Sequence, residues 1–221
     1  MNFRGHQKFI RTLLDGMGFE TEMWEVDAAQ LENGPGRGVR PDRDMSGMPV
    51  VVGQLPGAVN VIASGDRQSL RSNPPTSEEI ASPNDGQHRP ARNDMASRSL
   101  ILNGHYDVVP EGDAALWMYD PYSATLAAGR MYGRGTADMK GGNAAMLFAV
   151  KMIQQAGLTF NGDLTVQIAP DEEATCMGTL ACCLRGYTAD AAFIPEPTNM
   201  GILVAMRGSV YGTITVYGRA G

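Results

Sequence analysis

Apolar and polar positions follow two periods along this chain, and each period predicts one kind of element. Near the start, apolar residues recur at helical spacing between Phe9 and Leu14, and Gly16 or Gly18 would end that helix. Residues 19–26 (FETEMWEV) then predict a strand. Short runs with strand character recur farther along, at residues 58–64, 99–104, 163–169, 191–194, 202–206 and 209–218. The last run alternates cleanly between apolar and polar residues, which is typical of a strand with two different faces.

Two further helical patterns lie between the later strands. Residues 143–155 show helical spacing, and Gly157 follows as a stop. The apolar face of that helix would comprise Met146, Ala149, Val150 and Ile153. A shorter helix fits residues 178–186. Strands that alternate with helices predict a layered α/β fold, in which sites lie beyond the carboxyl ends of the strands.

Two segments lack either period and are expected to be loops. Residues 34–44 are rich in Gly, Pro and Arg. Residues 64–98 are full of Ser, Pro, Asn and Asp with almost no apolar residues, and they include His88. Such a composition cannot bury enough apolar surface to offset the entropy of ordering. We therefore expect residues 64–98 to be a solvated, disordered insertion, and we read it as a loop extension rather than a functional tail.

The composition is that of an ordinary globular protein, with 221 residues, 43% hydrophobic, 19% charged and a formal net charge of -6. This length suits one large domain with a substantial core. The acidic residues are spread along the chain and no basic cluster stands out, so we expect no nucleic-acid partner and no anionic membrane surface. No apolar run approaches the length of a membrane span, and no secretion signal precedes the first residues.

The cysteines Cys176, Cys182 and Cys183 are few, close together and odd in number. Their spacing matches no zinc motif, and it does not suggest a disulfide framework. We interpret them as reduced, mostly packed thiols in a cytoplasmic protein. A reactive thiol is the alternative, although no histidine lies nearby in the sequence to activate one.

A titratable pair, His105 and Asp107, follows the predicted strand 99–104. Positions i and i+2 of an extended chain share a face. The aspartate could therefore accept a hydrogen bond from one imidazole nitrogen and leave the other nitrogen free for a metal. The alternative is a polar strand end with a hydrogen-bonded histidine and no metal.

Four further carboxylates lie at similar junctions. Asp138 lies within GRGTADMKGG, where dense glycines suggest tight or left-handed backbone, although a helix N-cap is the alternative. Glu172 and Glu173 follow the strand 163–169, where a surface charge pair is the common alternative. Glu196 lies between two prolines, which position a side chain. One imidazole with several carboxylates suits zinc, or manganese or cobalt, and a bridging carboxylate could hold two metals about 3.5 to 4 Å apart.

The order of these motifs resembles a known family. His-x-Asp, Gly-Arg-Gly-x-x-Asp-Met-Lys-Gly-Gly, Asp-Glu-Glu and Glu-Pro-Thr follow one another, with a W…DPY segment from Trp117 to Tyr122. This pattern is similar to that of the co-catalytic zinc deacylases and exopeptidases, which include acetylornithine deacetylase, succinyl-diaminopimelate desuccinylase, aminoacylase and glutamate carboxypeptidase. The spacing looks closest to the acetylornithine deacetylase and succinyl-diaminopimelate desuccinylase branch. The resemblance runs from about Val50 to the end, apart from the insertion.

The resemblance implies a role for each site residue. His105 and Glu196 would bind one metal and Glu173 the other, with Asp138 bridging both. Asp107 would orient His105. Glu172 would be the general base that takes a proton from the metal-bridging water and passes it to the leaving amine. The implied reaction is hydrolysis of an amide bond in an N-acyl amino acid or dipeptide, with zinc as the cofactor, two ions per complete site.

The resemblance also implies a domain organisation. Residues 1–207 would form a zinc-exopeptidase-like catalytic domain, a mixed sheet with flanking helices. Residues 208–221 would begin the lid and dimerisation domain, so the chain would be truncated at the first strand of that domain. Full-length relatives are expected to be homodimers.

The end of the chain departs from the family pattern. The family completes its second metal site with a histidine far downstream and uses a lid histidine after the strand that ends this chain at Gly221. His6 and His88 are not placed to substitute. We therefore expect a complete first metal site and a second that has only Asp138 and Glu173, with little activity in the isolated chain. The alternative function is a non-catalytic fragment, or one piece of a split assembly, that binds at most one metal.

Overall fold

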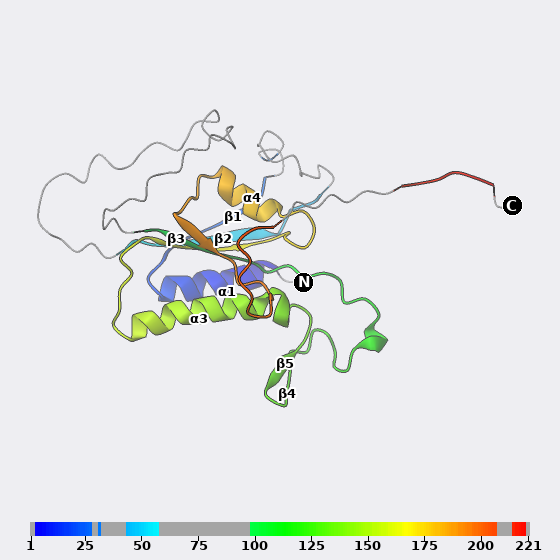
Figure 1. The fold of residues 1–221 in the computed structure, drawn as a ribbon, viewed down its shortest axis with the longest axis horizontal. Helices are drawn as coiled ribbons and strands as arrows, with labels where there is room; N and C mark the ends of the chain where they lie inside the picture. The colour runs from blue at the N-terminus through cyan, green and yellow to red at the C-terminus, as the bar shows by residue number, and fades with distance from the viewer. Residues whose placement is uncertain (1–2, 28–30, 32–42, 58–97, 207–213, 220–221) are drawn as a thin grey trace, which may run out of the picture.

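The computed structural model of the protein describes residues 3–27, 31, 43–57, 98–206 and 214–219. A five-stranded sheet in the order β1-β2-β6-β3-β7 lies at its centre (Figure 1). The strands are β1 (Glu20–Glu25), β2 (Pro49–Leu55), β3 (Leu100–His105), β6 (Leu164–Ala169) and β7 (Ala191–Phe193). β3 runs parallel to β6 and β7, whereas β2 runs antiparallel to β1 and β6. The sheet is therefore mixed, as predicted.

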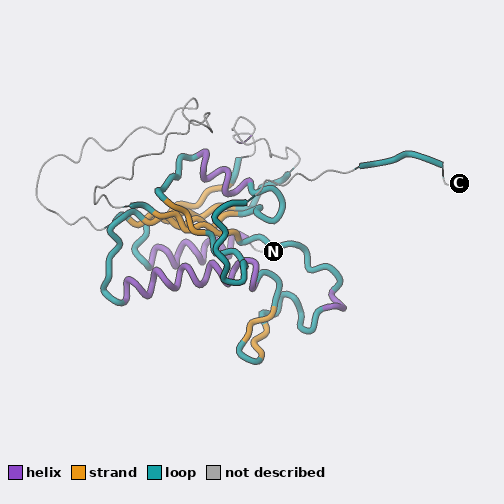
Figure 2. The backbone as a smooth tube through the Cα atoms, in the orientation of Figure 1, coloured by secondary structure: helices purple, strands orange, loops and turns teal. Residues whose placement is uncertain are grey.

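Helices cover both faces of this sheet (Figure 2). The helices α1 (Phe3–Gly16) and α3 (Gly141–Gln155) lie side by side on one face, and α4 (Met177–Leu184) lies on the other. Each face buries its own apolar cluster, and Leu14, Met146 and Tyr106 belong to the cluster under α1 and α3. Met177 and Cys182 belong to the cluster under α4. None of the described helices combines the length and apolar character that crossing a bilayer requires.

The segment between β3 and α3 carries a small projection. It contains a short 3₁₀ turn, η1 (Ala114–Leu116), and a two-stranded hairpin of β4 (Thr125–Ala127) and β5 (Arg130–Tyr132). A further turn, η2 (Thr136–Lys140), then leads directly into α3. The hairpin extends away from the sheet (Figure 1), whereas η2 lies at the carboxyl end of β3.

The predicted apolar face of α3 is partly wrong. Met146 and Val150 are buried as predicted, but Ala149 and Ile153 are exposed. The buried face instead includes Leu147 and, one turn earlier, the polar Asn143. The spacing predicted a different buried face, because a polar residue such as asparagine is normally assigned to the solvent side of a helix.

Other strands also differ from the sequence-based predictions. The strand β2 was not predicted, because it begins with a continuous apolar run, Pro49 to Val52, that lacks alternation and is typical of a strand buried on both faces. Residues 202–206 are exposed and form no strand, since the sheet ends at β7 and offers them no pairing partner among the described residues. Residues 214–218 likewise form no strand.

The thiols of Cys176 and Cys183 are exposed and only Cys182 is buried, so the expectation of mostly packed thiols is wrong.

Several predictions concern residues outside the described ranges. The strand at 58–64, nearly all of the insertion at 64–98 and most of the loop at 34–44 lie outside the described residues. The same is true of residues 209–213 at the predicted domain boundary. The division into residues 1–207 and 208–221 therefore stays a prediction.

Gly104→Ala is expected to destabilise the fold by about 1–3 kcal/mol, because the added Cβ would overlap Oδ1 of the buried Asn143. The Asn143 amide donates to the His105 carbonyl oxygen at 2.7 Å, so the same change would disturb the end of β3. The measurement is the free energy of unfolding in urea. Gly16→Ala is the matched control, since no atom lies within 4 Å of its added Cβ. Equal stability of the two variants would contradict this close approach.

Candidate metal centre

The side chain of His105 emerges from the carboxyl end of β3 on the face covered by α4. Neighbouring residues of β3 alternate between faces, and Leu102 packs under α1 and α3 while Asn103 reaches Thr179 of α4. The backbone N–H of His105 donates to Sδ of Met139 at 3.2 Å, and its carbonyl accepts from Asn143. Contacts with η2 and α3 therefore fix the backbone of His105 from the opposite side of the sheet.

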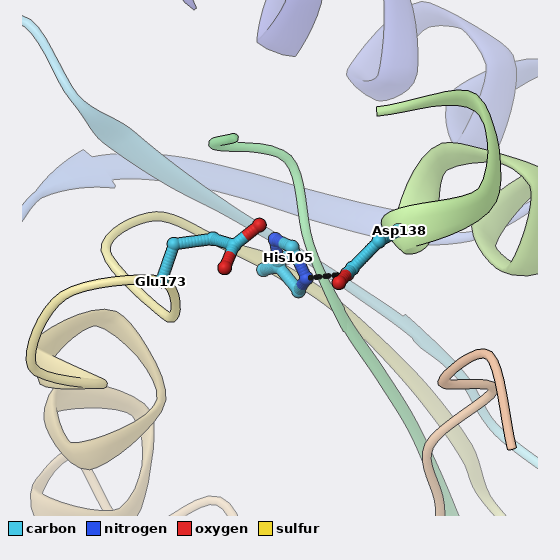
Figure 3. A group of neighbouring side chains, drawn as sticks. All are labelled: His105, Asp138 and Glu173. Atoms are coloured by element: carbon cyan, nitrogen blue, oxygen red, sulfur yellow. Dashed lines mark hydrogen bonds and ion pairs between the residues drawn. The ribbon is translucent and has the colours of Figure 1, made fainter. Parts of the chain in front are cut away.

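The His105 ring is 2% exposed, and both of its nitrogens face oxygen atoms. Nδ1 lies 3.0 Å from the backbone oxygen of Asp107 and 3.6 Å from its Oδ1. Nε2 lies 3.0 Å from Oδ1 of Asp138 (Figure 3). The chain therefore places Asp107 behind the ring, as the i, i+2 spacing predicts, although the shorter contact comes from its carbonyl oxygen rather than its carboxylate.

Asp138 projects from η2 through an irregular backbone. Gly135 has φ +82°, which favours glycine, and Asp138 itself is extended at φ -120° and ψ 101°. A Cβ on Gly142 would overlap the Pro195 carbonyl oxygen, so the loop that carries Glu196 packs against the start of α3. Asp138 is not the N-cap of α3, because that helix begins at Gly141. The glycines around Asp138 therefore permit a tight turn at Gly135 and a close backbone contact between Gly142 and Pro195, as their density suggests.

Asp107 also holds the loop after β6. Its Oδ1 accepts the backbone N–H of Glu172 at 3.2 Å, and its Oδ2 accepts that of Glu173 at 3.3 Å. Burial opposes ionisation of Asp107, but the hydrogen bond and charge of His105 and these two N–H groups outweigh it and lower its pKa. Asp107 is therefore an anion that links His105 to the two glutamates.

A second buried aspartate, Asp171, supports the same loop and was not predicted. It has φ +69° and is fully buried, and its Oδ1 accepts a hydrogen bond from Nε of Arg43 at 2.7 Å. Its carbonyl accepts the N–H groups of Thr175 and Cys176. The adjacent Asp-Glu-Glu residues were a signal for this role, but nothing in the sequence pairs Asp171 with Arg43.

The structure brings all the predicted site residues into one cluster. Glu173 faces His105 from the loop after β6 (Figure 3), and His105, Asp138 and Glu173 each offer an atom within 4.8 Å of the others. His105, Glu172 and Glu196 form a second such group. Nε2 lies 3.7 Å from Oε1 of Glu196 and 3.8 Å from Oε2 of Glu172. Glu172, expected as a base, therefore lies as close to the imidazole as Glu196, expected as a ligand.

The electrostatics of the cluster favour a bound cation. Burial alone lowers the pKa of His105, but Asp107, then Asp138 and Glu196, outweigh burial and raise it to about 9. Burial raises the pKa of Glu172 and Glu196, and the neighbouring carboxylates add to this rise against the opposing charge of His105. The surrounding carboxylates thus stabilise a positive charge at the imidazole of the cluster. A divalent cation fits this donor set in place of a proton.

Asp107→Asn is expected to weaken metal binding by about 10- to 100-fold, because the ring of His105 and the loop with Glu173 lose their shared anion. Competition with a chromogenic chelator measures the affinity. Asp113→Asn, which removes a carboxylate that accepts from Ala115 in an exposed turn, is the matched control. An affinity of Asp107→Asn equal to that of the control would show that the carboxylate does not orient the site.

The raised pKa of His105 also predicts a pH dependence of the metal-free chain. Since the pKa is about 9 in the folded state against 6.5 ordinarily, protonation contributes stability that is fully present below pH 6.5 and is lost as pH rises through 9. The measurement is the free energy of unfolding of the wild-type chain minus that of His105→Gln, with metal removed. This difference is expected to fall across that range, and a difference that stays constant would contradict the raised pKa.

Comparisons with known proteins agree with this geometry. Residues 101–207 match the profile of Peptidase family M20/M25/M40. Succinyl-diaminopimelate desuccinylase of Methylobacterium radiotolerans is 36% identical over 199 residues, which are 85% of this chain and 50% of that protein. N-formyl-4-amino-5-aminomethyl-2-methylpyrimidine deformylase of Halalkalibacterium halodurans is 44% identical over 119 residues, 54% of this chain and 28% of that protein.

The fold is shared with solved structures. The M20 family metallo-carboxypeptidase Sso-CP2 from Sulfolobus solfataricus superposes with a TM-score of 0.52 at 18% sequence identity, over 87% of this chain and 32% of that chain. The chain thus spans half or less of the length of the relatives it matches. The matched region 101–207 contains every residue of the candidate metal centre. Residues 101–207, just under half of this chain, therefore match a domain of peptidase family M20/M25/M40.

Proposed function

We propose that the whole protein hydrolyses an amide bond in a small N-acylated substrate at a zinc centre. The observation that carries this proposal is the single buried imidazole of His105, surrounded by carboxylates from separate loops at one edge of the sheet. The similarity to a desuccinylase and a deformylase supports removal of an acyl group from nitrogen. An N-acyl amino acid or a dipeptide is the substrate class we propose.

The proposed ligand roles follow the donor atoms of the cluster. His105 and Glu196 would hold one metal and Glu173 a second, and Asp138 would serve both. When bound, the metal lowers the pKa of a water molecule and polarises the substrate carbonyl. Asp107 keeps the His105 ring and the Glu173 loop in place through its contacts with both.

Glu172 is the proposed general base. Its backbone N–H is held by Asp107, while its carboxylate is 42% exposed and free to face a substrate. Burial and its acidic neighbours raise its pKa, which brings the carboxylate closer to the range where it can accept and release a proton near neutral pH. Glu172 would take a proton from the attacking water and deliver it to the leaving amine.

Further properties of the whole protein remain part of this proposal. Cobalt or manganese could replace zinc, since one imidazole and several carboxylates suit all three ions. A cytoplasmic location is consistent with the three free cysteines, because unpaired thiols are typical of reducing compartments. We also propose that the whole protein is a homodimer.

The whole protein, expressed from its complete gene, provides the test. We expect it to release the acid from N-succinyl or N-formyl amines, to lose this activity after chelator treatment, and to regain it with zinc. The 221-residue chain alone, with only Asp138 and Glu173 for a second ion, is expected to bind metal without comparable turnover. A metal-loaded whole protein without hydrolase activity on any N-acyl amino acid or dipeptide would favour the alternative, a non-catalytic metal-binding protein.

A further inference from the structure

A pocket of about 210 Å³ lies beside the carboxyl end of β3, on the face of the sheet opposite the metal centre. Tyr106, the residue between His105 and Asp107, points into the α1 and α3 side, where its ring lies 5.5 Å from those of Phe3 and His6. Val108 shares that face, two residues along the chain. Phe3, Tyr106 and Val108 give the pocket an apolar wall, which none of the metal-centre residues lines.

Three nitrogen-bearing side chains from three segments form the other wall of this pocket: His6 of α1, Arg134 before η2, and Lys140 at its end. Nδ1 of His6 and Nε of Arg134 are buried and have no hydrogen-bond partner within the described ranges. The Lys140 ammonium likewise has neither an ion pair nor a hydrogen bond there. Burial and then the charge of Lys140 lower the pKa of His6, against an opposing effect of Gln7. Burial also lowers the pKa of Lys140, against the opposing charge of Asp107.

The existing contacts of these groups do not satisfy them. Arg134 donates from Nη2 to the Pro110 carbonyl at 3.2 Å and lies 5.1 Å from the Trp117 ring centre, which leaves Nε unused. The remaining polar residue of the pocket, Tyr122, already donates to Glu111 at 2.8 Å. No carboxylate lines the pocket among the described residues, and Glu111 and Asp107 act on Arg134 and Lys140 only from outside its lining. Buried donors without partners are costly, so their convergence points to an anionic ligand.

We propose that this pocket binds a small carboxylate with a short apolar chain. The cationic side chains Arg134 and Lys140, with His6, would hold the carboxylate oxygens, and Arg134 offers an unused N–H for a charge-assisted hydrogen bond. The apolar wall would receive the hydrocarbon chain, a contact that phosphate or chloride could not make. The proposed site shares no residue with the metal centre, because no metal ligand lines the pocket.

Butyrate is the probe, titrated into the metal-free chain after chelator treatment and desalting, at constant ionic strength. Amide correlation spectra are expected to show saturable shifts at Tyr106, Val108 and Lys140. Arg134→Gln is expected to weaken butyrate binding about tenfold. Arg130→Gln, which removes the same charge from the exposed strand β5, is the matched control and should change the affinity by less than about twofold. Equal affinities of the two variants, or no saturable shifts, would overturn the proposal.

Phosphate and chloride at the same ionic strength test the ligand class. Binding of phosphate without binding of butyrate would overturn the carboxylate assignment. A second measurement needs no variant and so does not depend on whether Arg134→Gln folds. Nuclear Overhauser effects from the butyrate methyl group to the Phe3 ring and the Val108 methyl groups of the wild-type chain are expected, and their absence at saturation would place the ligand elsewhere and overturn the proposal.

Discussion

Replacing His105 by alanine is expected to remove tight zinc binding from this chain. His105 supplies the only imidazole of the cluster, and it belongs to both groups of side chains that could hold an ion within the described part of the chain. Loss of this ligand leaves carboxylates alone, which suit zinc less well than a site with imidazole. We expect zinc affinity to fall by more than about 100-fold. Elemental analysis after equilibrium dialysis against a zinc buffer measures the bound metal.

A matched control separates the site from a general effect of losing a histidine. His6 also carries a partly buried imidazole next to Tyr106, but on the opposite face of the sheet. His6→Gln is therefore expected to keep the zinc content of the wild-type chain. Zinc retained at the wild-type level by His105→Ala would mean that the ion binds elsewhere.

The second large effect is expected from Glu172→Gln in the whole protein. This change keeps the size of the side chain and removes only its capacity to accept a proton. If Glu172 is the general base, kcat falls by about 10²- to 10⁴-fold while the metal content stays unchanged. Steady-state hydrolysis of an N-succinyl or N-formyl amine, together with elemental analysis of the same sample, measures both quantities.

Glu173→Gln is the matched comparison for that experiment, because the two glutamates are adjacent and both backbone N–H groups bind Asp107. Glu173→Gln should lose metal as well as activity, since its carboxylate belongs to the group with His105 and Asp138. Loss of metal from Glu172→Gln would instead make Glu172 a ligand. Its Oε2 lies 3.8 Å from Nε2 of His105, so the structure permits that result and the experiment decides.

The candidate site could be predicted from sequence because most of its residues follow an apolar run. His105 ends β3, Glu172 and Glu173 follow β6, and Glu196 follows β7. These three strands are parallel neighbours, so their carboxyl ends meet at one edge of the sheet. The positions at strand ends therefore predicted that these residues lie together, and the family resemblance supplied their roles. The dense glycines around Asp138 indicated the tight turn that completes the cluster.

The supporting contacts could not be predicted, because they join residues that local patterns do not relate. A polar residue such as Asn143 is expected on the surface of α3, but it is buried and donates to the His105 carbonyl. Arg43 and Asp171 are 128 residues apart, and only the folded chain pairs them. The strand β2 was missed because its unbroken apolar run lacks the alternation that marks a half-buried strand. Periodicity reports which face is buried, and not which polar groups meet there.

A zinc-soaked crystal of this chain, with data collected at the zinc absorption edge, tests the proposed centre most directly. The predicted result is an anomalous peak about 2.0–2.1 Å from Nε2 of His105, with an oxygen of Asp138 also in the coordination sphere. Nε2 and Oδ1 of Asp138 now lie 3.0 Å apart, so small side-chain movements suffice to admit the ion. An anomalous peak remote from His105, or none at saturating zinc, would contradict a metal centre at this edge of the sheet.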